Sequence, residues 1–171
     1  MKRPGCDFMG KVGKDEYKRM RKLMIACVLG TDMAKHMTEV GKFKSKIQSE
    51  DFDPSSGAER EETIVMLFHL ADISNSSKKW PICLNWIDRL FQEFFMQGDM
   101  ERDKGFPISY LMDRTTVCVA RCQIGFLDFI ILPAFSAAAQ VLPRMDENLQ
   151  NVLKNKEEWT QRFEEYDKKM E

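Results

Sequence analysis

Asp72 is the residue with the clearest chemical potential in this sequence, because it directly follows an apolar helical segment that ends at Ala71. A carboxylate in apolar surroundings is costly to desolvate unless a partner compensates it. That partner is an arginine, a lysine, a helix N-terminus or a metal ion, and the residue types alone leave these alternatives open. A polar turn, Ser74–Ser77, and an aromatic-rich helix follow. The stretch 67–98 is therefore the candidate site.

Cysteine and histidine usage gives no separate metal or disulfide signal. The chain has two histidines, His36 and His69, and the spacing of its cysteines does not indicate a set of disulfide pairs. Core thiols in a reducing compartment are the simplest interpretation. The first residues lack the continuous apolar run of a secretory signal. We therefore expect a cytoplasmic protein. The cysteines are Cys6, Cys27, Cys83, Cys118 and Cys122.

The composition is that of a soluble domain with no general attraction to polyanions. The chain has 171 residues, 43% hydrophobic and 31% charged, with a formal net charge of −1. This balance predicts binding neither to nucleic acid nor to an anionic membrane surface. The most apolar run, 124–142, is interrupted by Asp128, Pro133 and Gln140. It predicts a buried core helix rather than a membrane-spanning segment.

Hydrophobic spacing predicts an all-α, multi-helix bundle. Apolar residues recur at intervals of three and four, and no alternating run flanked by hairpin turns is present. Residues 1–14 are expected to be a loose N-terminal segment, and residues 15–171 the helical part of the chain. The expected helices are 15–29, 33–47, 57–72, 80–97 and 114–131, with Pro133 kinking or restarting the last toward residue 142, and one or two more within 146–171.

Local signals place the helix that leads into the candidate site. Ser56 followed by Glu59 fits a capping box, so a helix should begin near Gly57. Its expected inward residues are Ile64, Leu67, Phe68 and Ala71, which would put Asp72 at a buried C-terminal end. After the next helix, Gly98 has the position of a residue that ends a helix.

Several segments in order resemble a known family. HLADISN, WIDRLFQEFFMQGDMERDKG, MDR and CQIGFLDFIILPAF are similar to the second half of the catalytic domain of class I cyclic nucleotide phosphodiesterases. The upstream TDMAKH resembles another family landmark, and the resemblance covers roughly residues 17–142. Several separate motifs in the correct order are far more specific than one short pattern.

The resemblance implies a fold, a reaction and a set of site residues. It implies helices around a deep pocket with two divalent ions, zinc and magnesium or manganese, which activate a water that attacks the cyclic phosphate of the bound nucleotide. Asp72 matches a metal-binding aspartate, Gln123 the glutamine that hydrogen-bonds the purine, Phe126 the ring that stacks on it and Leu90 the opposite side of the clamp. Further matches to substrate-binding positions are Met33, Asn75, Phe91, Phe94 and Leu111.

The family's His-Asn-x-x-His motif and its later His-Asp pair are missing, so no catalytic residue is assigned within this chain. His36 and His69 align with other positions, in TDMAKH and HLAD, and are expected to be structural. One carboxylate cannot hold two divalent ions. The chain thus resembles a C-terminal fragment whose partner would be the missing N-terminal half of the catalytic domain.

Three functions are compatible with the sequence. The first is hydrolysis of 3′,5′-cyclic nucleotides by a larger domain that includes this chain. The second is a catalytically incomplete module that binds a nucleotide or a partner, and the third is a plain helical interaction domain. Similarity of the TDMAKH, FMQGD and MDR segments gives a slight preference for cGMP over cAMP, while Asn75 does not decide. A glutamine that is free to present either face of its amide would accept both.

Overall fold

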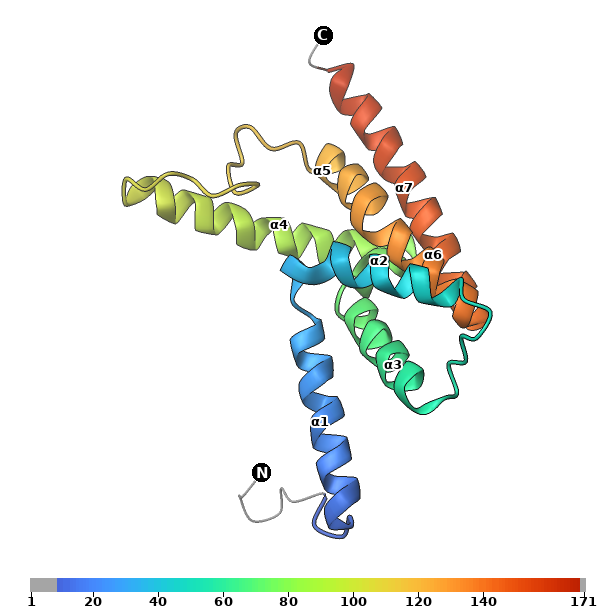
Figure 1. Cartoon of the computed structure of the whole chain (residues 1–171). Coiled ribbons are helices and arrows are strands. Elements are labelled where there is room, and N and C mark those ends of the chain that lie inside the picture. Colours follow the sequence, from blue (N-terminus) through green and yellow to red (C-terminus); the bar gives the residue numbers. More distant parts are fainter. Residues whose placement is uncertain (1–8, 170–171) are drawn as a thin grey trace. The chain divides into compact units, whose positions relative to one another are not determined.

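The computed structural model describes residues 9–169 and divides the chain into two units, with the boundary between Ala71 and Asp72, which are described separately (Figure 1). Within the described residues every regular element is helical and none is a strand, which confirms the all-α prediction. Of the expected loose segment, residues 1–8 lie outside the described part of the chain.

The first unit contains three helices whose ends follow local signals. They are α1 (Lys14–Gly30), α2 (His36–Ile47) and α3 (Gly57–Asp72), with the single turn η1 (Met33–Lys35) before α2; the last residue of α3, Asp72, belongs to the second unit. Asp32 accepts a hydrogen bond from the backbone N–H of Ala34 at 3.0 Å and so starts η1. Glu59 accepts from the Ser56 hydroxyl and from the Asp53 N–H, both at 2.9 Å. The predicted start of α3 at Gly57 is confirmed.

The inward face of α3 differs from the predicted one. Thr63, Met66, His69 and Leu70 are buried, whereas Ile64, Phe68, Ala71 and Asp72 are exposed. Apolar residues are distributed around this helix, so hydrophobic spacing does not define one face. Burial of Asp72 was therefore predicted wrongly. In the elements before α3, Met33 and Met37 are exposed, while Val40 and Phe43 are buried.

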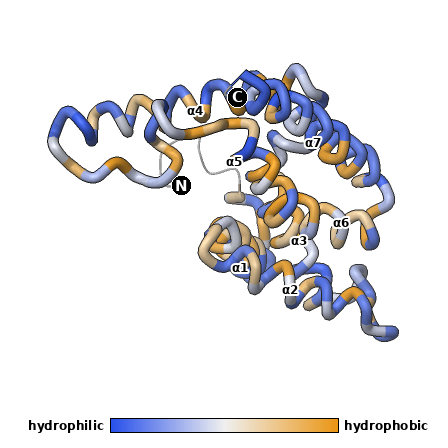
Figure 2. The backbone as a smooth tube through the Cα atoms, turned by 90° about the horizontal axis from the view of Figure 1, so that it is seen from above, coloured by the Kyte–Doolittle hydropathy of each residue, from blue (hydrophilic) through white to orange (hydrophobic). Residues whose placement is uncertain are grey.

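In the second unit, a long broken helix and the long helix that precedes it both pack against the last helix of the chain. Its elements are η2 (Ser74–Ser77), α4 (Trp80–Asp103), α5 (Val119–Phe126), the π-helical turn η3 (Leu127–Ile131), α6 (Leu132–Val141), η4 (Pro143–Met145) and α7 (Asp146–Asp167). Figure 2 shows the hydrophobic residues concentrated along α5 and α6. The side chains that form this core are Cys83, Ile87, Phe91, Leu127, Ile131, Phe135, Val152 and Trp159.

The expected break near Pro133 takes the form of a π-helical turn. The chain is helical from Val119 to Val141, and η3 ends two residues before Pro133, whose missing N–H removes one helical hydrogen bond. This continuous helix is long and apolar enough to cross a membrane by length and composition alone. Core helices of soluble proteins meet the same criterion, and Leu127 and Ile131 are buried within the unit. Absence of a membrane segment stays a prediction.

Helix α4 extends beyond its predicted end. It continues through Gly98 to Asp103, and the residue that reverses the chain is Gly105, with φ 72°. The Gly105 N–H donates to Arg102 O at 3.0 Å and the Phe106 N–H donates to Glu101 O at 2.9 Å, the pattern of a Schellman motif. The next helix begins at Val119 rather than at Arg114, so the irregular connection covers 104–118.

Candidate functional site

One cavity of the second unit gathers most of the predicted site residues. It has a volume of about 320 Å³ and is lined from the end of α3, η2, α4, the 104–118 loop and α5. Met33 is the exception: it lies in η1 of the first unit and is 43% exposed, and its role stays a prediction. The predicted residues that line the cavity are Asp72, Asn75, Leu90, Phe91, Phe94, Leu111, Gln123 and Phe126.

Gln123 is the most informative polar group in this cavity. Its side chain comes from α5, is 5% exposed, and has an amide oxygen with no hydrogen-bond partner among residues 9–169. A buried acceptor without a partner is unfavourable, so such an atom usually meets a ligand or an ordered water. Phe126 lies three residues later on the same helix, and Leu90 comes from α4. The cavity therefore combines an amide with aromatic and aliphatic walls, which suits a flat heterocycle with a polar edge.

Asp72 contributes an exposed carboxylate to the same cavity. Within the described part of the chain it makes no ion pair or side-chain hydrogen bond. Because it faces solvent, it needs no neutralising partner. The expected cost of removing this carboxylate from water therefore does not apply. Its position at the cavity wall, not burial, is what makes it a candidate ligand.

The turn between Asp72 and α4 is held by α7. Asn155, 1% exposed, donates from Nδ2 to the carbonyl oxygens of Ser76 at 2.8 Å and Lys78 at 2.7 Å. Asn151 donates to Ser77 O at 3.2 Å. Sequence reasoning missed this contact. The sequence does contain a signal for this contact, because Asn148, Asn151 and Asn155 are spaced three and four residues apart and so lie on one face of a helix.

The described residues do not form a metal site by themselves. No group of three or more histidine, cysteine, aspartate or glutamate side chains that could hold a metal ion occurs within 9–169. Asp72 supplies one carboxylate to the cavity, whereas zinc sites take three or four protein ligands. The residues of this stretch thus do not fit a complete two-metal centre.

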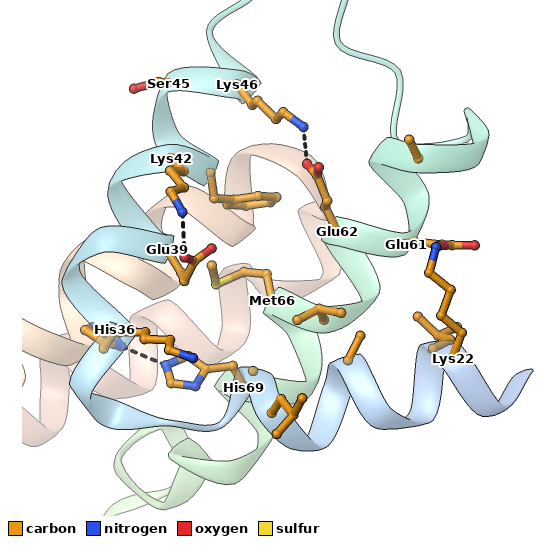
Figure 3. A pocket seen from close by; sticks show the side chains of 18 residues that line it. Lys22, His36, Glu39, Lys42, Ser45, Lys46, Glu61, Glu62, Met66 and His69 are labelled. Atoms are coloured by element: carbon orange, nitrogen blue, oxygen red, sulfur yellow. Dashed lines mark hydrogen bonds and ion pairs between the residues drawn. The ribbon is translucent and has the colours of Figure 1, made fainter. Parts of the chain in front are cut away.

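A second cavity lies within the first unit, between α1, α2 and α3, with a volume of about 940 Å³. Figure 3 shows the imidazoles of His36 and His69 directed at each other, and Nδ1 of His36 lies 2.7 Å from Nε2 of His69. Both rings are buried. Lys42 pairs with Glu39 at 2.8 Å at the same cavity. Nδ1 of His69 is buried and has no hydrogen-bond partner among residues 9–169, so the structural role of both histidines stays a prediction.

Comparison with known proteins gives the family of this all-α chain. Residues 1–152 match the family model described as 3′5′-cyclic nucleotide phosphodiesterase, and the chain belongs to this family. The high affinity cGMP-specific 3′,5′-cyclic phosphodiesterase 9A of Homo sapiens is 35% identical over 144 residues, which are 84% of this chain and 24% of that protein. The dual specificity calcium/calmodulin-dependent 3′,5′-cyclic nucleotide phosphodiesterase 1B of Bos taurus is 43% identical over 129 residues, 75% of this chain and 23% of that protein.

These relatives are named as phosphodiesterases, so the family is enzymatic. The chain spans about a quarter of the length of the curated relatives it matches. The family as a whole uses divalent metal ions.

Proposed function

We propose that this chain forms the base-binding part of an enzyme that hydrolyses 3′,5′-cyclic nucleotides. Water adds to phosphorus, the bond between phosphorus and the 3′ oxygen breaks, and the 3′ oxygen takes a proton to give a 5′-nucleoside monophosphate. Gln123 would bind the purine edge, with Phe126 and Leu90 on the two faces of the base. Asp72 would supply one ligand to two divalent ions, zinc and magnesium or manganese, whose other ligands come from outside the described residues.

The observation that carries this proposal is the amide oxygen of Gln123, which is buried and has no hydrogen-bond partner among the described residues. Gln123 lines the same cavity as Phe126 and Asp72. Adenine and guanine each present a donor beside an acceptor, and an amide can meet both. The cavity volume of about 320 Å³ is of the size that holds a small ligand.

The same amide supports acceptance of both purines. No side chain in the described range hydrogen-bonds it, so neither of its two orientations is fixed by the protein. A slight preference for cGMP over cAMP remains part of the proposal through the resemblance. The relatives are consistent with either outcome, because one is named cGMP-specific and another dual specificity.

We expect Gln123→Leu to weaken binding of cGMP and cAMP by about tenfold or more, because leucine has a similar size but cannot hydrogen-bond the base. Displacement of a fluorescent cGMP analogue from the purified chain by each nucleotide measures this. Gln140→Leu is the matched control, since Gln140 is exposed on the same long helix and outside the cavity. Equal affinities for both variants and the unchanged chain would contradict the assignment of Gln123.

We expect the purified chain alone to show no cyclic nucleotide turnover above background when zinc and magnesium are added, because Asp72 is a single carboxylate. Chromatography of the 5′-monophosphate product measures this, and Asp72→Ala should leave the background unchanged. Robust turnover by the chain would contradict the expectation.

A catalytically incomplete module that binds a nucleotide or a partner is the alternative. Co-expression with a polypeptide that carries the missing histidine motifs distinguishes the two. Turnover that appears only in the mixture, and is lost with Asp72→Ala, supports the enzyme. Binding without turnover in the mixture supports the module.

A further inference from the structure

The loop that connects α4 to α5 returns along α4 instead of extending into solvent. Gly105 reverses the chain, and the backbone of Met112 lies against Gly98, five residues before the end of α4. A Cβ atom built on Gly98 would be 1.9 Å from the Met112 carbonyl oxygen, so only glycine permits this approach. The loop is thus packed directly on the helix that forms one wall of the cavity around Gln123.

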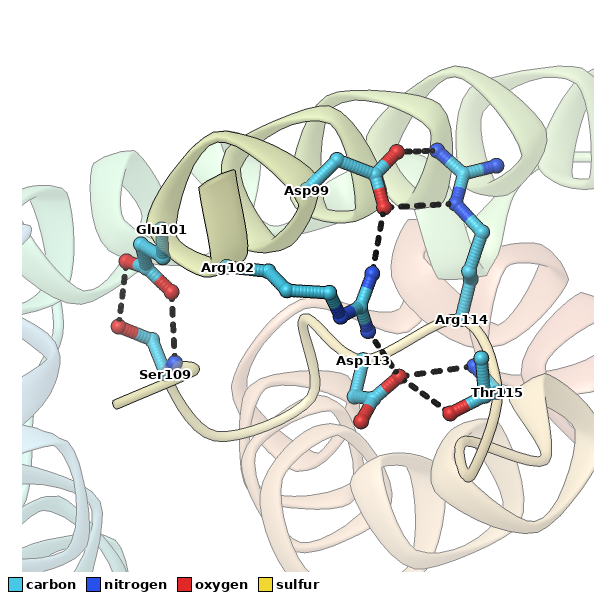
Figure 4. A network of polar contacts seen from close by, with 7 residues as sticks. All are labelled: Asp99, Glu101, Arg102, Ser109, Asp113, Arg114 and Thr115. Carbon is cyan, nitrogen blue, oxygen red and sulfur yellow. Dashed lines mark hydrogen bonds and ion pairs between the residues drawn. The ribbon is translucent and has the colours of Figure 1, made fainter. Parts of the chain in front are cut away.

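Polar contacts fasten the loop to the last turns of α4 at several points (Figure 4). Asp99 accepts from Nε of Arg114 at 3.1 Å and also from Nη2 of the same side chain. Arg102 donates to Asp99 at 3.1 Å and to Asp113 at 2.8 Å, so it links both carboxylates. We call this set the loop strap: Asp99, Glu101 and Arg102 on α4, and Ser109, Asp113 and Arg114 on the loop.

A contact between Glu101 and Ser109 holds the part of the loop that precedes Leu111. Glu101 accepts from the Ser109 N–H at 2.7 Å and from the Ser109 hydroxyl at 2.8 Å. Asp113 in turn accepts from the N–H and the hydroxyl of Thr115, at 2.9 and 2.7 Å. The hydrogen bond from Arg114 lowers the pKa of the Asp99 carboxyl group. This group therefore stays charged at a lower pH than an ordinary aspartate does.

Leu111 lies between the two fastened points and has a φ of 67°. This left-handed conformation is unfavourable for a branched side chain and persists only where the surrounding structure imposes it. Leu111 is also a wall residue of the cavity that contains Gln123 and Phe126. The fastened points on either side, at Ser109 and at Asp113, are each two residues away.

We propose that the loop strap is a positioning device: the contacts of Asp99, Arg102 and Glu101 hold Leu111 in the wall of the cavity and thereby set its affinity for nucleotide. The effect on affinity rests on the proposed function of the cavity, whereas the ordering of the loop does not. The side chains of Asp99, Arg102 and Arg114 are 40%, 43% and 47% exposed, so salt screens their interactions.

The test compares Asp99→Asn with Asp103→Asn in the full chain. Both changes remove one negative charge from the end of α4, but Asp103 is exposed and takes part in no ion pair or side-chain hydrogen bond in the described range. Amide hydrogen exchange of residues 108–114 reports the order of the loop. Displacement of a fluorescent cGMP analogue reports the affinity of the cavity. Asp99→Glu keeps the carboxylate and serves as the conservative variant.

We expect Asp99→Asn to speed exchange in 108–114 and to weaken nucleotide binding by about tenfold, with Asp103→Asn unchanged and Asp99→Glu partly restored. Raising the salt concentration should speed exchange in the unchanged chain and have little further effect in Asp99→Asn. Equal exchange in Asp99→Asn and Asp103→Asn overturns the inference, as does faster exchange with unchanged affinity. If the unchanged chain fails to bind nucleotide, the proposed function fails, and the exchange measurement still decides whether the strap positions the loop.

Discussion

Replacing Gly98 with alanine is expected to lower the free energy of unfolding by about 3 kcal/mol, because the added methyl group overlaps backbone atoms of a packed loop. The Cβ atom would lie 1.9 Å from the oxygen and 2.7 Å from the carbon of the Met112 carbonyl. Backbone atoms cannot move aside as the end of a flexible side chain can. The loop has to leave the surface of α4, which also strains the contacts of Asp99 with Arg114.

Gly125→Ala is the matched control for this change. Gly125 is also a helical glycine of the second unit, in α5, but a Cβ atom there has no neighbour within 4 Å. Alanine should therefore stabilise the protein by about 0.5–1 kcal/mol, since it restricts the unfolded chain and favours the helix. Urea unfolding followed by circular dichroism gives both values. A similar free energy of unfolding for the two variants would mean that the contact at Gly98 is not tight in solution.

The positions of the helices could be predicted from sequence, while their ends and faces could be predicted only in part. Spacing of apolar residues located the helices, and the capping-box signal at Ser56 and Glu59 predicted the start of α3. The end of α4 was misplaced because Gly98 has two possible roles, ending a helix or admitting a close neighbour. Only the contact with Met112, fourteen residues later in the chain, decides between them.

The residues of the cavity, too, could be predicted only in part, because some of its features depend on contacts between distant parts of the chain. Resemblance to a family predicted a shared site for Gln123, Phe126, Leu90 and Asp72, and the structure places these residues around one cavity. Burial of Asp72 was predicted wrongly because α3 has apolar residues on several sides. The strap on Asp99 could not be predicted, since its partners depend on how the loop folds back.

We expect Asn155→Ala to lower the free energy of unfolding by about 3 kcal/mol, because it removes the donor from the carbonyl group of the buried Ser76 and from that of Lys78. Asn155 is 1% exposed and bonds the carbonyl oxygens of Ser76 and Lys78 at 2.8 and 2.7 Å. Asn155→Asp keeps the size of the side chain but turns an oxygen toward these carbonyls, so it should destabilise at least as much. The fluorescence of Trp159, buried one turn later on α7, reports unfolding.

Asn151→Ala is the control for Asn155→Ala. It tests whether the loss of stability comes from the two hydrogen bonds of Asn155 or would follow the removal of any asparagine on α7. Asn151 is only half-buried and makes one longer bond, to Ser77 O at 3.2 Å, so its loss should cost about 1 kcal/mol or less. The two variants should also differ in nucleotide binding, because the turn that Asn155 holds carries Asn75 and directly follows Asp72, both in the cavity wall. If both variants unfold at the same urea concentration, the turn is held by its packing and not by the amide of Asn155. In that case α7 supports the cavity only through its apolar face.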